Sequence, residues 1–273
     1  MLFVPSECCT QIVSNSGIVG TANPWTGVVA GGSANTYGSA VELIASADNL
    51  YDSWGIEIII AQTGASGVSS ETAVDILGGA ATEDVLIDSL LGGFAYAGTS
   101  MRYFFPLYIP AGTRIAAKAS SAVASNALRV GVYLYGGGNP PFRTGGRVTT
   151  YGTKANNSSG QTVVPTASGG AASATELSAS SSHDHAYWTT GFQVLGDGSI
   201  TTAGWVNVGI GVGAATEERI GTWFYPKATT EQMAGPIPMM GVFRDIPSGT
   251  RLTMLASNSS GNDAGYSGLI YAV

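Results

Sequence analysis

The chain has 273 residues, of which 44% are hydrophobic and only 11% are charged, and its formal net charge is −7. This apolar content excludes a disordered chain, and the absence of a three-residue glycine period excludes collagen although 39 residues are glycine. The sequence has no uninterrupted apolar stretch of about 18 residues, which is the length that a transmembrane helix needs. Its acidic balance argues against nucleic-acid binding, which needs clustered basic residues.

The N-terminal segment MLFVPSECCT has no basic region and only a four-residue apolar run before Pro5. We therefore expect no signal peptide, and synthesis in a cytoplasm. Cys8 and Cys9 are the only cysteines, and we interpret them as free thiols, with a vicinal or intermolecular disulfide as the alternative. Two thiols without a third ligand nearby do not indicate a metal site.

Short patterned segments follow, separated by clusters of glycine, proline and asparagine. Their apolar residues recur at alternate positions, as in Trp205–Val212, which is typical of half-buried strands. The spacing of the turns is typical of β-sandwiches. The predicted strands are Gly55–Gln62, Thr72–Leu77, Asp84–Leu91, Arg102–Ile109, Thr113–Ala119, Leu128–Tyr135, Gly191–Leu195, Trp205–Val212, Arg219–Tyr225, Ile237–Ile246, Thr250–Ala256 and Gly265–Val273, while Ala40–Ala47 fits a strand or a short helix.

The second half of the chain repeats the first. Residues 109–114 read IPAGTR and residues 246–251 read IPSGTR, and the pattern VxIxxGAATE at 74–83 recurs at 208–217. Further collinear matches join Glu42-Leu43 to Glu176-Leu177, Gly131 to Gly268, and Asp48, Tyr51 and Gly55 to Asp184, Tyr187 and Gly191, the last three 136 residues apart. The repeat predicts two homologous domains in tandem.

We predict an N-terminal arm at 1–9, a first domain at 10–137, a linker at 138–149 and a second domain at 150–273. The predicted fold is all-β, with two antiparallel β-sandwiches of jelly-roll type. The Gly/Ser/Asn-rich stretch 136–174 is interpreted as a connector or an extended arm. We expect this connector and the arm Met1–Thr10 to reach a neighbouring subunit.

The repeated IP(A/S)GTR element has a mechanical interpretation, because proline presets one turn position and glycine supplies a left-handed one. We predict a hairpin between Phe104–Ile109 and Thr113–Ala119. Its copy would join Phe243–Ile246 to Thr250–Ala256.

Several polar residues are candidates for a functional site. His183 and His185 are interpreted as exposed loop residues, with a metal-binding pair as the alternative. Asp184 between them is interpreted as a turn residue. Glu83 and Glu217 recur in the repeat, and we interpret them as acceptors of backbone N–H groups rather than as acids or bases.

Arg114 and Arg251 each follow the repeated turn. They are expected either to pair with a local carboxylate or carbonyl or to contact a neighbouring subunit, and with Cys8 and Cys9 they are the interface candidates. The sequence contains no nucleophile elbow, no phosphate-binding loop and no recognisable carboxylate pair. We therefore expect no enzymatic activity and no cofactor.

The segment Phe104–Lys118, which reads FFPLYIPAGTRIAAK, is similar to segments of tailed-bacteriophage virion proteins, and Phe243–Ala256 is its partial copy. The copy departs from it at 252–255, where LTML replaces IAAK. The resemblance implies a homo-oligomeric virion protein of the tail, collar or baseplate, assembled with other virion proteins in the host cytoplasm. The alternatives are a capsid decoration or head-appendage protein and, from another class, a carbohydrate-binding module for host-surface glycans. No nucleic acid or membrane partner is expected.

Overall fold

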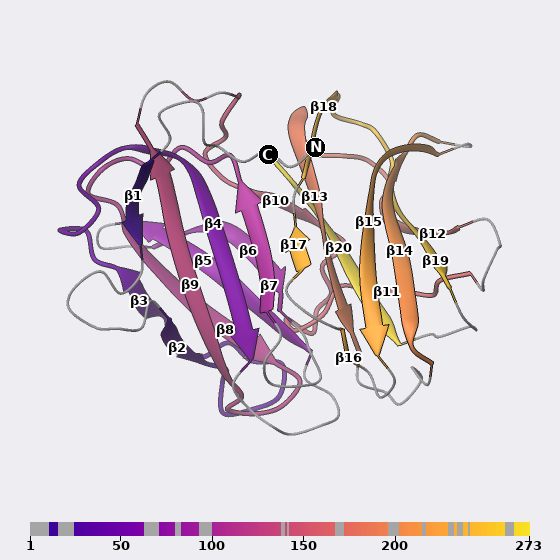
Figure 1. Ribbon diagram of the computed structural model, residues 1–273, viewed down its shortest axis with the longest axis horizontal. Helices are drawn as coiled ribbons and strands as arrows, with labels where there is room; N and C mark the ends of the chain where they lie inside the picture. Colours follow the sequence, from indigo (N-terminus) through magenta and orange to yellow (C-terminus); the bar gives the residue numbers. More distant parts are fainter. Residues whose placement is uncertain are drawn as a thin grey trace.

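The computed structural model describes residues 11–15, 25–62, 71–79, 83–92, 100–137, 140, 142–166, 172–195, 202–214, 217–228, 232–233, 237–239, 241–259 and 265–273. Within these residues every regular element is a β-strand. The described part of the chain has no helix long and apolar enough to cross a membrane. Figure 1 shows two sandwich units side by side.

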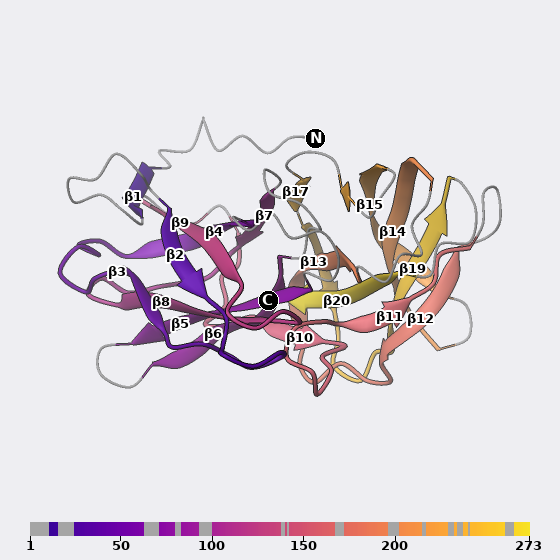
Figure 2. The same cartoon turned by 90° about the horizontal axis from the view of Figure 1, so that it is seen from below.

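The first unit consists of two facing sheets, which Figure 2 shows as layers. One sheet has the order β1-β9-β4-β7, with β2 also paired to β9, and the other has the order β3-β8-β5-β6. The strands are β1 Gln11–Asn15, β2 Thr26–Val29, β3 Val41–Ile44, β4 Ser53–Gln62, β5 Thr72–Gly79, β6 Asp84–Leu91, β7 Ser100–Phe105, β8 Arg114–Ser121 and β9 Ala127–Gly136.

The second unit has the same plan. Its sheets have the orders β10-β20-β13-β18, with β11 also paired to β20, and β12-β19-β14-β15-β16. The strands are β10 Thr149–Tyr151, β11 Gln161–Val163, β12 Ser173–Ser178, β13 His185–Val194, β14 Gly204–Val212, β15 Glu218–Ala228, β16 Gln232–Met233, β17 Ile237–Met239, β18 Val242–Ile246, β19 Leu252–Asn258 and β20 Tyr266–Ala272. Strand β17 pairs in parallel with β7 of the first unit.

The two strand orders superimpose element by element. Two short strands share β9 in the first unit as two share β20 in the second, and β3-β8-β5-β6 corresponds to β12-β19-β14-β15. Two four-membered sheets in this order form a jelly roll. The predicted all-β fold with tandem antiparallel sandwiches is therefore confirmed, while the bounds 10–137 and 150–273 stay a prediction.

Period-two alternation identifies the core-facing side of the strands. In β14 the alternate residues Val206, Val208, Ile210 and Val212 are 1%, 0%, 0% and 6% exposed. In β9 the same holds for Val130, Val132 and Leu134, which are all fully buried. Side chains on alternate positions therefore fill the space between the two layers of each unit, as the pattern predicted.

The predicted hairpins are wrong. Strand β7 pairs with β4 and β17, whereas β8 pairs with β3 and β5, so the turn between them connects two sheets. The same is true of β18 and β19. Gly112 and Gly249 do have the expected left-handed backbone, with φ of +76° and +82°. Turn residues determine how the chain reverses, but the hydrophobic faces of the following strand decide which sheet it joins.

One set of sequence matches is corrected by the hydrogen bonds at this turn. The Gly112 N–H donates to Asn49 O at 2.7 Å, and the Gly249 N–H donates to Ser181 O at 2.9 Å. Likewise Asp52 accepts the Ala111 N–H at 2.8 Å and Asp184 accepts the Ser248 N–H at 2.7 Å. The counterpart of Asp184 is therefore Asp52, 132 residues earlier, and the matches of Asp48, Tyr51 and Gly55 were coincidental. The match of Gly131 to Gly268 was coincidental too, because Gly131 pairs with Ile59, whose counterpart Gly191 pairs with Leu269.

The stretch 136–174 is bound to its own chain where it is described, and its contact with a neighbouring subunit stays a prediction. The Val148 N–H donates to Leu86 O at 2.8 Å, and the Thr150 hydroxyl donates to Asp88 O at 2.8 Å. Strands β10 and β11 both pair with β20 of the same chain. A Gly/Ser-rich composition permits an extended segment, and here that segment becomes edge strands.

Candidate functional site

The charges that recur in the repeat form the same ion-pair cluster twice. Arg114 Nε lies 2.6 Å from Glu42 Oε2, and its Nη1 pairs with Glu83. Arg251 Nε lies 2.6 Å from Glu176 Oε2, and its Nη1 lies 2.6 Å from Glu217 Oε1. Each arginine connects a glutamate on an edge strand, β3 or β12, to a glutamate that directly precedes β6 or β15. We call this arrangement the arginine clamp.

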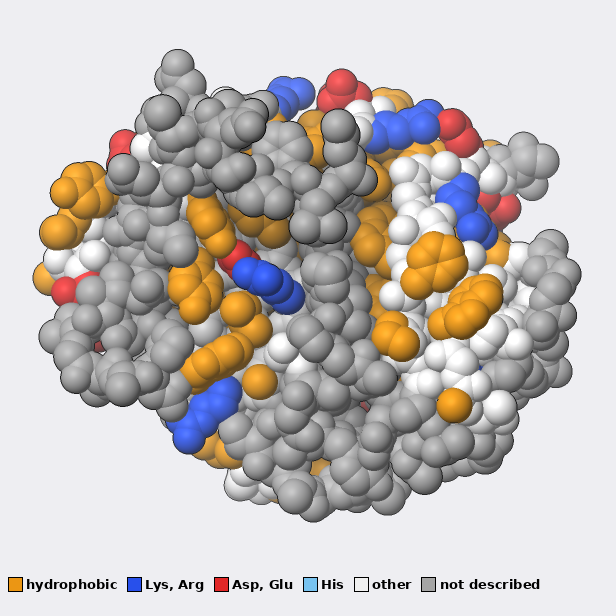
Figure 3. Space-filling model, viewed as in Figure 1, with side chains coloured by type: hydrophobic (Ala, Val, Ile, Leu, Met, Phe, Trp, Pro, Cys, Tyr) orange, Lys and Arg blue, Asp and Glu red, His pale blue; other side chains and the backbone are white. Residues whose placement is uncertain are grey.

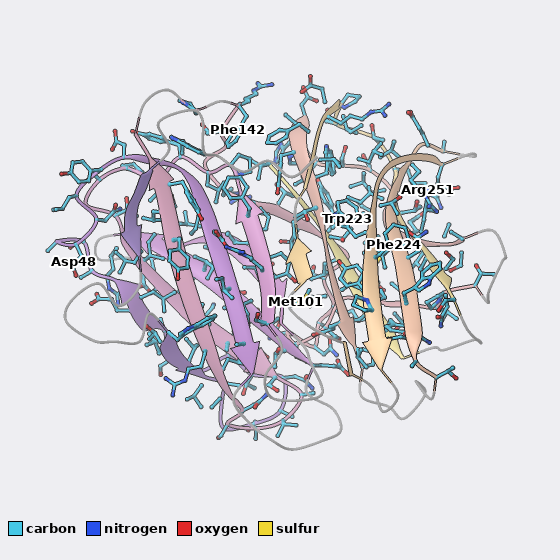
Figure 4. The ribbon with its side chains drawn as sticks, viewed as in Figure 1. Asp48, Met101, Phe142, Trp223, Phe224 and Arg251 are labelled. Atoms are coloured by element: carbon cyan, nitrogen blue, oxygen red, sulfur yellow. The ribbon has the colours of Figure 1, made fainter. Side chains whose placement is uncertain are left out.

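The clamp corrects the interpretation of the two glutamates. Glu83 and Glu217 accept the guanidinium of an arginine rather than backbone N–H groups alone, and the Arg251 hydrogen bond holds the pKa of the Glu217 carboxyl below its usual range. Arg114 and Arg251 thus pair with local carboxylates, which was one of the two expectations. Their contact with a neighbouring subunit stays a prediction, and Cys8 and Cys9 lie outside the described residues. Figure 4 labels Arg251 on the second unit.

The two histidines have different surroundings. His183 is exposed, as expected, but His185 at the start of β13 is only 7% exposed, so its assignment to an exposed loop is wrong. The Nε2 atom of His185 lies 2.8 Å from the Tyr151 hydroxyl. Burial, with a smaller contribution from His183, lowers the pKa of His185 to about 4. The described residues contain no group of three or more His, Cys, Asp or Glu side chains that could hold a metal ion.

We expect His185 to make stability depend on pH. Its pKa is about 4 in the folded chain against an ordinary 6.5, so the unfolded chain binds a proton first as the pH falls below 6.5. Stability is therefore complete above that pH and decreases toward pH 4, by about 3 kcal/mol for this group. Urea unfolding at pH 7.5 and pH 4.5 measures the difference, which should shrink in His185→Gln. The matched variant His183→Gln should keep most of it, and an unchanged difference in His185→Gln would contradict the assignment.

Sequence reasoning missed a buried charge cluster in the first unit. Asp75 of β5 is 3% exposed. Its Oδ1 accepts the Tyr37 hydroxyl at 2.8 Å and the Ser89 N–H at 2.9 Å, and Lys118 Nζ lies 3.2 Å from its Oδ2. Ser89 holds a left-handed backbone with φ of +57° at a bulge in β6. The available signal was a difference between copies, because Gly209 stands at the position equivalent to Asp75.

The two jelly rolls meet through a continuous network of aromatic rings. Phe105 of β7 lies edge-on to Tyr271 of β20 at a centroid distance of 5.9 Å, and Phe142 stacks on Phe243 at 5.1 Å. These separations are those of favourable aromatic pairs. The full network comprises Trp54, Tyr103, Phe104, Phe105, Tyr135, Phe142, Tyr187, Phe243 and Tyr271. We call this contact between the units the joint.

Polar groups buried in the joint are paired across it. The Tyr271 hydroxyl accepts the Leu91 N–H at 2.9 Å and donates to Ser89 O at 2.8 Å. The Tyr187 hydroxyl donates to Phe104 O at 2.6 Å. Because buried polar groups are costly when unpaired, these bonds make the two units one body rather than two domains on a tether.

A second aromatic feature is open to solvent. Trp205 of β14 is 44% exposed and Phe224 of β15 is 60% exposed, and their rings meet edge-on at 5.7 Å. Asn207, paired across the strands with Phe224, has a buried side-chain oxygen for which the described residues provide no hydrogen-bond partner. Figure 3 shows hydrophobic side chains uncovered over this part of the second unit, and Figure 4 labels Phe224 there. We call these residues the β14–β15 face.

These features define the chain as a double jelly roll whose two halves share one buried joint. No protein-family model matches the sequence, and no curated protein matches it. The chain is similar to the solved structure of PNGase F, a glycosylasparaginase from Flavobacterium meningosepticum, at 9% identity and a TM-score of 0.35, over 91% of this chain and 95% of that one. It is also similar to PNGF-II, at 8% identity and a TM-score of 0.38, over 91% of this chain but only 64% of that one.

Two further similarities concern other classes of protein. The viral capsid protein STIV MCP matches at 8% identity and a TM-score of 0.36, over 91% of this chain and 94% of that one. The tandem CBM22-1–CBM22-2 domain of Paenibacillus barcinonensis Xyn10C matches at 11% identity and a TM-score of 0.30, over 98% of each chain.

The similarity to PNGase F corrects the expectation that the chain is not an enzyme. That expectation rested on motifs missing from the sequence, whereas the solved structures with a similar all-β build include a glycosylasparaginase. A catalytic site consists of a few side chains placed on a fold, so the fold does not exclude activity. At these TM-scores the similarities transfer no activity, ligand or site residue to this chain.

Proposed function

We propose that the chain is a structural protein of a phage virion that assembles as a homo-oligomer on the tail, collar or baseplate. The observation that carries the proposal is the β14–β15 face, where a tryptophan and a phenylalanine are exposed side by side on two paired strands. Exposed apolar surface of this kind on a soluble chain is typical of a contact site.

The composition supports the same conclusion. The chain has only 11 Lys and Arg and 18 Asp and Glu residues among 273. Seven ion pairs among the described residues, including both arginine clamps, occupy several of these charges internally. Few charges remain to keep an isolated chain in solution at high concentration. Neighbouring subunits that cover its surface would remove this cost.

The joint supplies the rigidity that a building block of a particle needs. Nine aromatic rings and buried hydrogen bonds hold the two jelly rolls together. A subunit whose two halves keep a fixed relation transmits load between its neighbours. The phage assignment itself depends on the resemblance of Phe104–Lys118 to virion proteins.

The test combines mass measurement with particle labelling. We expect light scattering of the purified chain to give a multiple of its 27.7 kDa mass, and we expect antibodies against it to mark the tail, collar or baseplate of purified particles in electron micrographs. Labelling of the head would contradict the tail location in favour of a capsid decoration. A monomer at all concentrations that is absent from particles would contradict the proposal, and retention on polysaccharide would then favour a carbohydrate-binding module.

A further inference from the structure

The joint uses different surfaces of the two jelly rolls. The first unit contributes the side formed by β6 and β7, where Leu91 and Phe105 lie. The second unit contributes the outward face of the sheet β10-β20-β13-β18, through Tyr187, Gln193 and Tyr271. When two homologous units contact each other through two different surfaces, their arrangement is head-to-tail.

The repeat identifies the counterpart of each joint surface. Ala73 pairs with Leu91 in the first unit, and the equivalent Asn207 pairs with Phe224 in the second, so Phe224 is the counterpart of Leu91. The counterpart of Tyr271 follows in the same way. Glu57 pairs with Tyr133 and the equivalent Thr189 pairs with Tyr271, so Tyr133 is the counterpart of Tyr271.

Each counterpart is more exposed than the joint residue to which it corresponds. Leu91 is 0% exposed and its N–H donates to Tyr271 of the second unit, whereas Phe224 is 60% exposed. Tyr271 is fully buried, whereas Tyr133 is half-buried on the outward face of β9. The chain therefore carries one completed joint and the two complementary halves of another.

We propose that a second copy of this chain binds the β14–β15 face with the outward face of its sheet β1-β9-β4-β7, so that the joint is repeated between chains. The proposal rests on the self-assembly in the proposed function and assigns the surfaces that carry it. Exposed Trp205 and Phe224 would become buried as Leu91 is. Head-to-tail contacts close into a ring when the rotation per step completes a turn and otherwise extend into a filament.

Two single substitutions and their mixture test the proposal. Phe224→Asp places a charge on the β14–β15 face, and Tyr133→Asp places one on the opposite half, so each variant alone should fall to the mass of one chain. Mixed in equal amounts, they should form a complex of two chains and no larger one, because each variant keeps the half that the other has lost. Tyr51→Asp is the matched control, since Tyr51 is 61% exposed and lies in the connection before β4, and it should keep the wild-type mass.

Other outcomes would overturn the proposal and separate it from the proposed function. An oligomer unchanged by Phe224→Asp would show that this face is not used. Loss of the oligomer in Phe224→Asp but not in Tyr133→Asp would show that the face binds itself in a symmetric dimer. An unchanged oligomer that loses retention on polysaccharide in Phe224→Asp would show that the face binds sugar. In each case particles that still contain the chain leave the virion function standing, and circular dichroism confirms that every variant is folded.

Discussion

Replacement of Tyr271 by alanine should lower the free energy of unfolding by about 4 kcal/mol, because a fully buried aromatic side chain is lost and a cavity remains. The ring lies 5.7 Å from Tyr103 and 5.9 Å from Phe105 between centroids. Its hydroxyl also satisfies the Leu91 N–H and the Ser89 carbonyl. Urea unfolding followed by circular dichroism measures the change at protein concentrations where the chain is monomeric.

Two further variants separate the ring from its hydroxyl and from its position. Tyr271→Phe keeps the ring and leaves the Leu91 N–H unpaired, which costs about 1–3 kcal/mol. Tyr133→Ala changes the counterpart on the open face, where the monomer should lose about 1 kcal/mol or less. If Tyr271→Ala and Tyr133→Ala were equally stable, the joint would contribute nothing to the stability of the monomer.

Asp75→Ala should cost about 3 kcal/mol, because it leaves the Lys118 ammonium, the Tyr37 hydroxyl and a buried N–H without their shared acceptor. The second unit shows how the position looks without the charges, since Gly209 and Leu255 occupy the equivalent places. The double variant Asp75→Ala/Lys118→Leu should therefore regain about 1 kcal/mol relative to Asp75→Ala. Thermal and urea unfolding of the three chains measure this coupling.

Exposed acids provide the control for this experiment. Asp84 at the start of β6 is exposed, and Asp84→Ala should change stability by about 0.5 kcal/mol or less. A double variant less stable than Asp75→Ala would mean that Lys118 contributes through packing and not through its ion pair.

Features that depend on local pattern were predictable from the sequence. Alternation marked β14 almost to the residue, because each second side chain must enter the core. The arginine clamp was signalled by three charges that recur together at equivalent places in the repeat. The fold class followed from the spacing of strands and turns.

Features that depend on contacts distant in the chain were not predictable. The Tyr271 hydroxyl meets the Leu91 N–H across 180 residues, and no pattern within one segment indicates its partner. The sequence of His183 and His185 is symmetric about Asp184, yet only His185 is buried, because Tyr151 from another strand lies against it. The predicted hairpin at the repeated turn was wrong for the same reason, because the strands that flank the turn pair with distant strands in two different sheets.

Strand β17 ties the completion of the first unit to the synthesis of the second. Residues 237–239 pair with Met101, Arg102 and Tyr103 at the edge of β7. On a ribosome that adds roughly 10 residues per second, this edge stays without its neighbour for about 14 seconds. A nascent first half is therefore a template for strand pairing with another nascent chain, the situation in which sheet edges cause aggregation. A fragment that ends at Gly137 would carry this unpaired edge at β7.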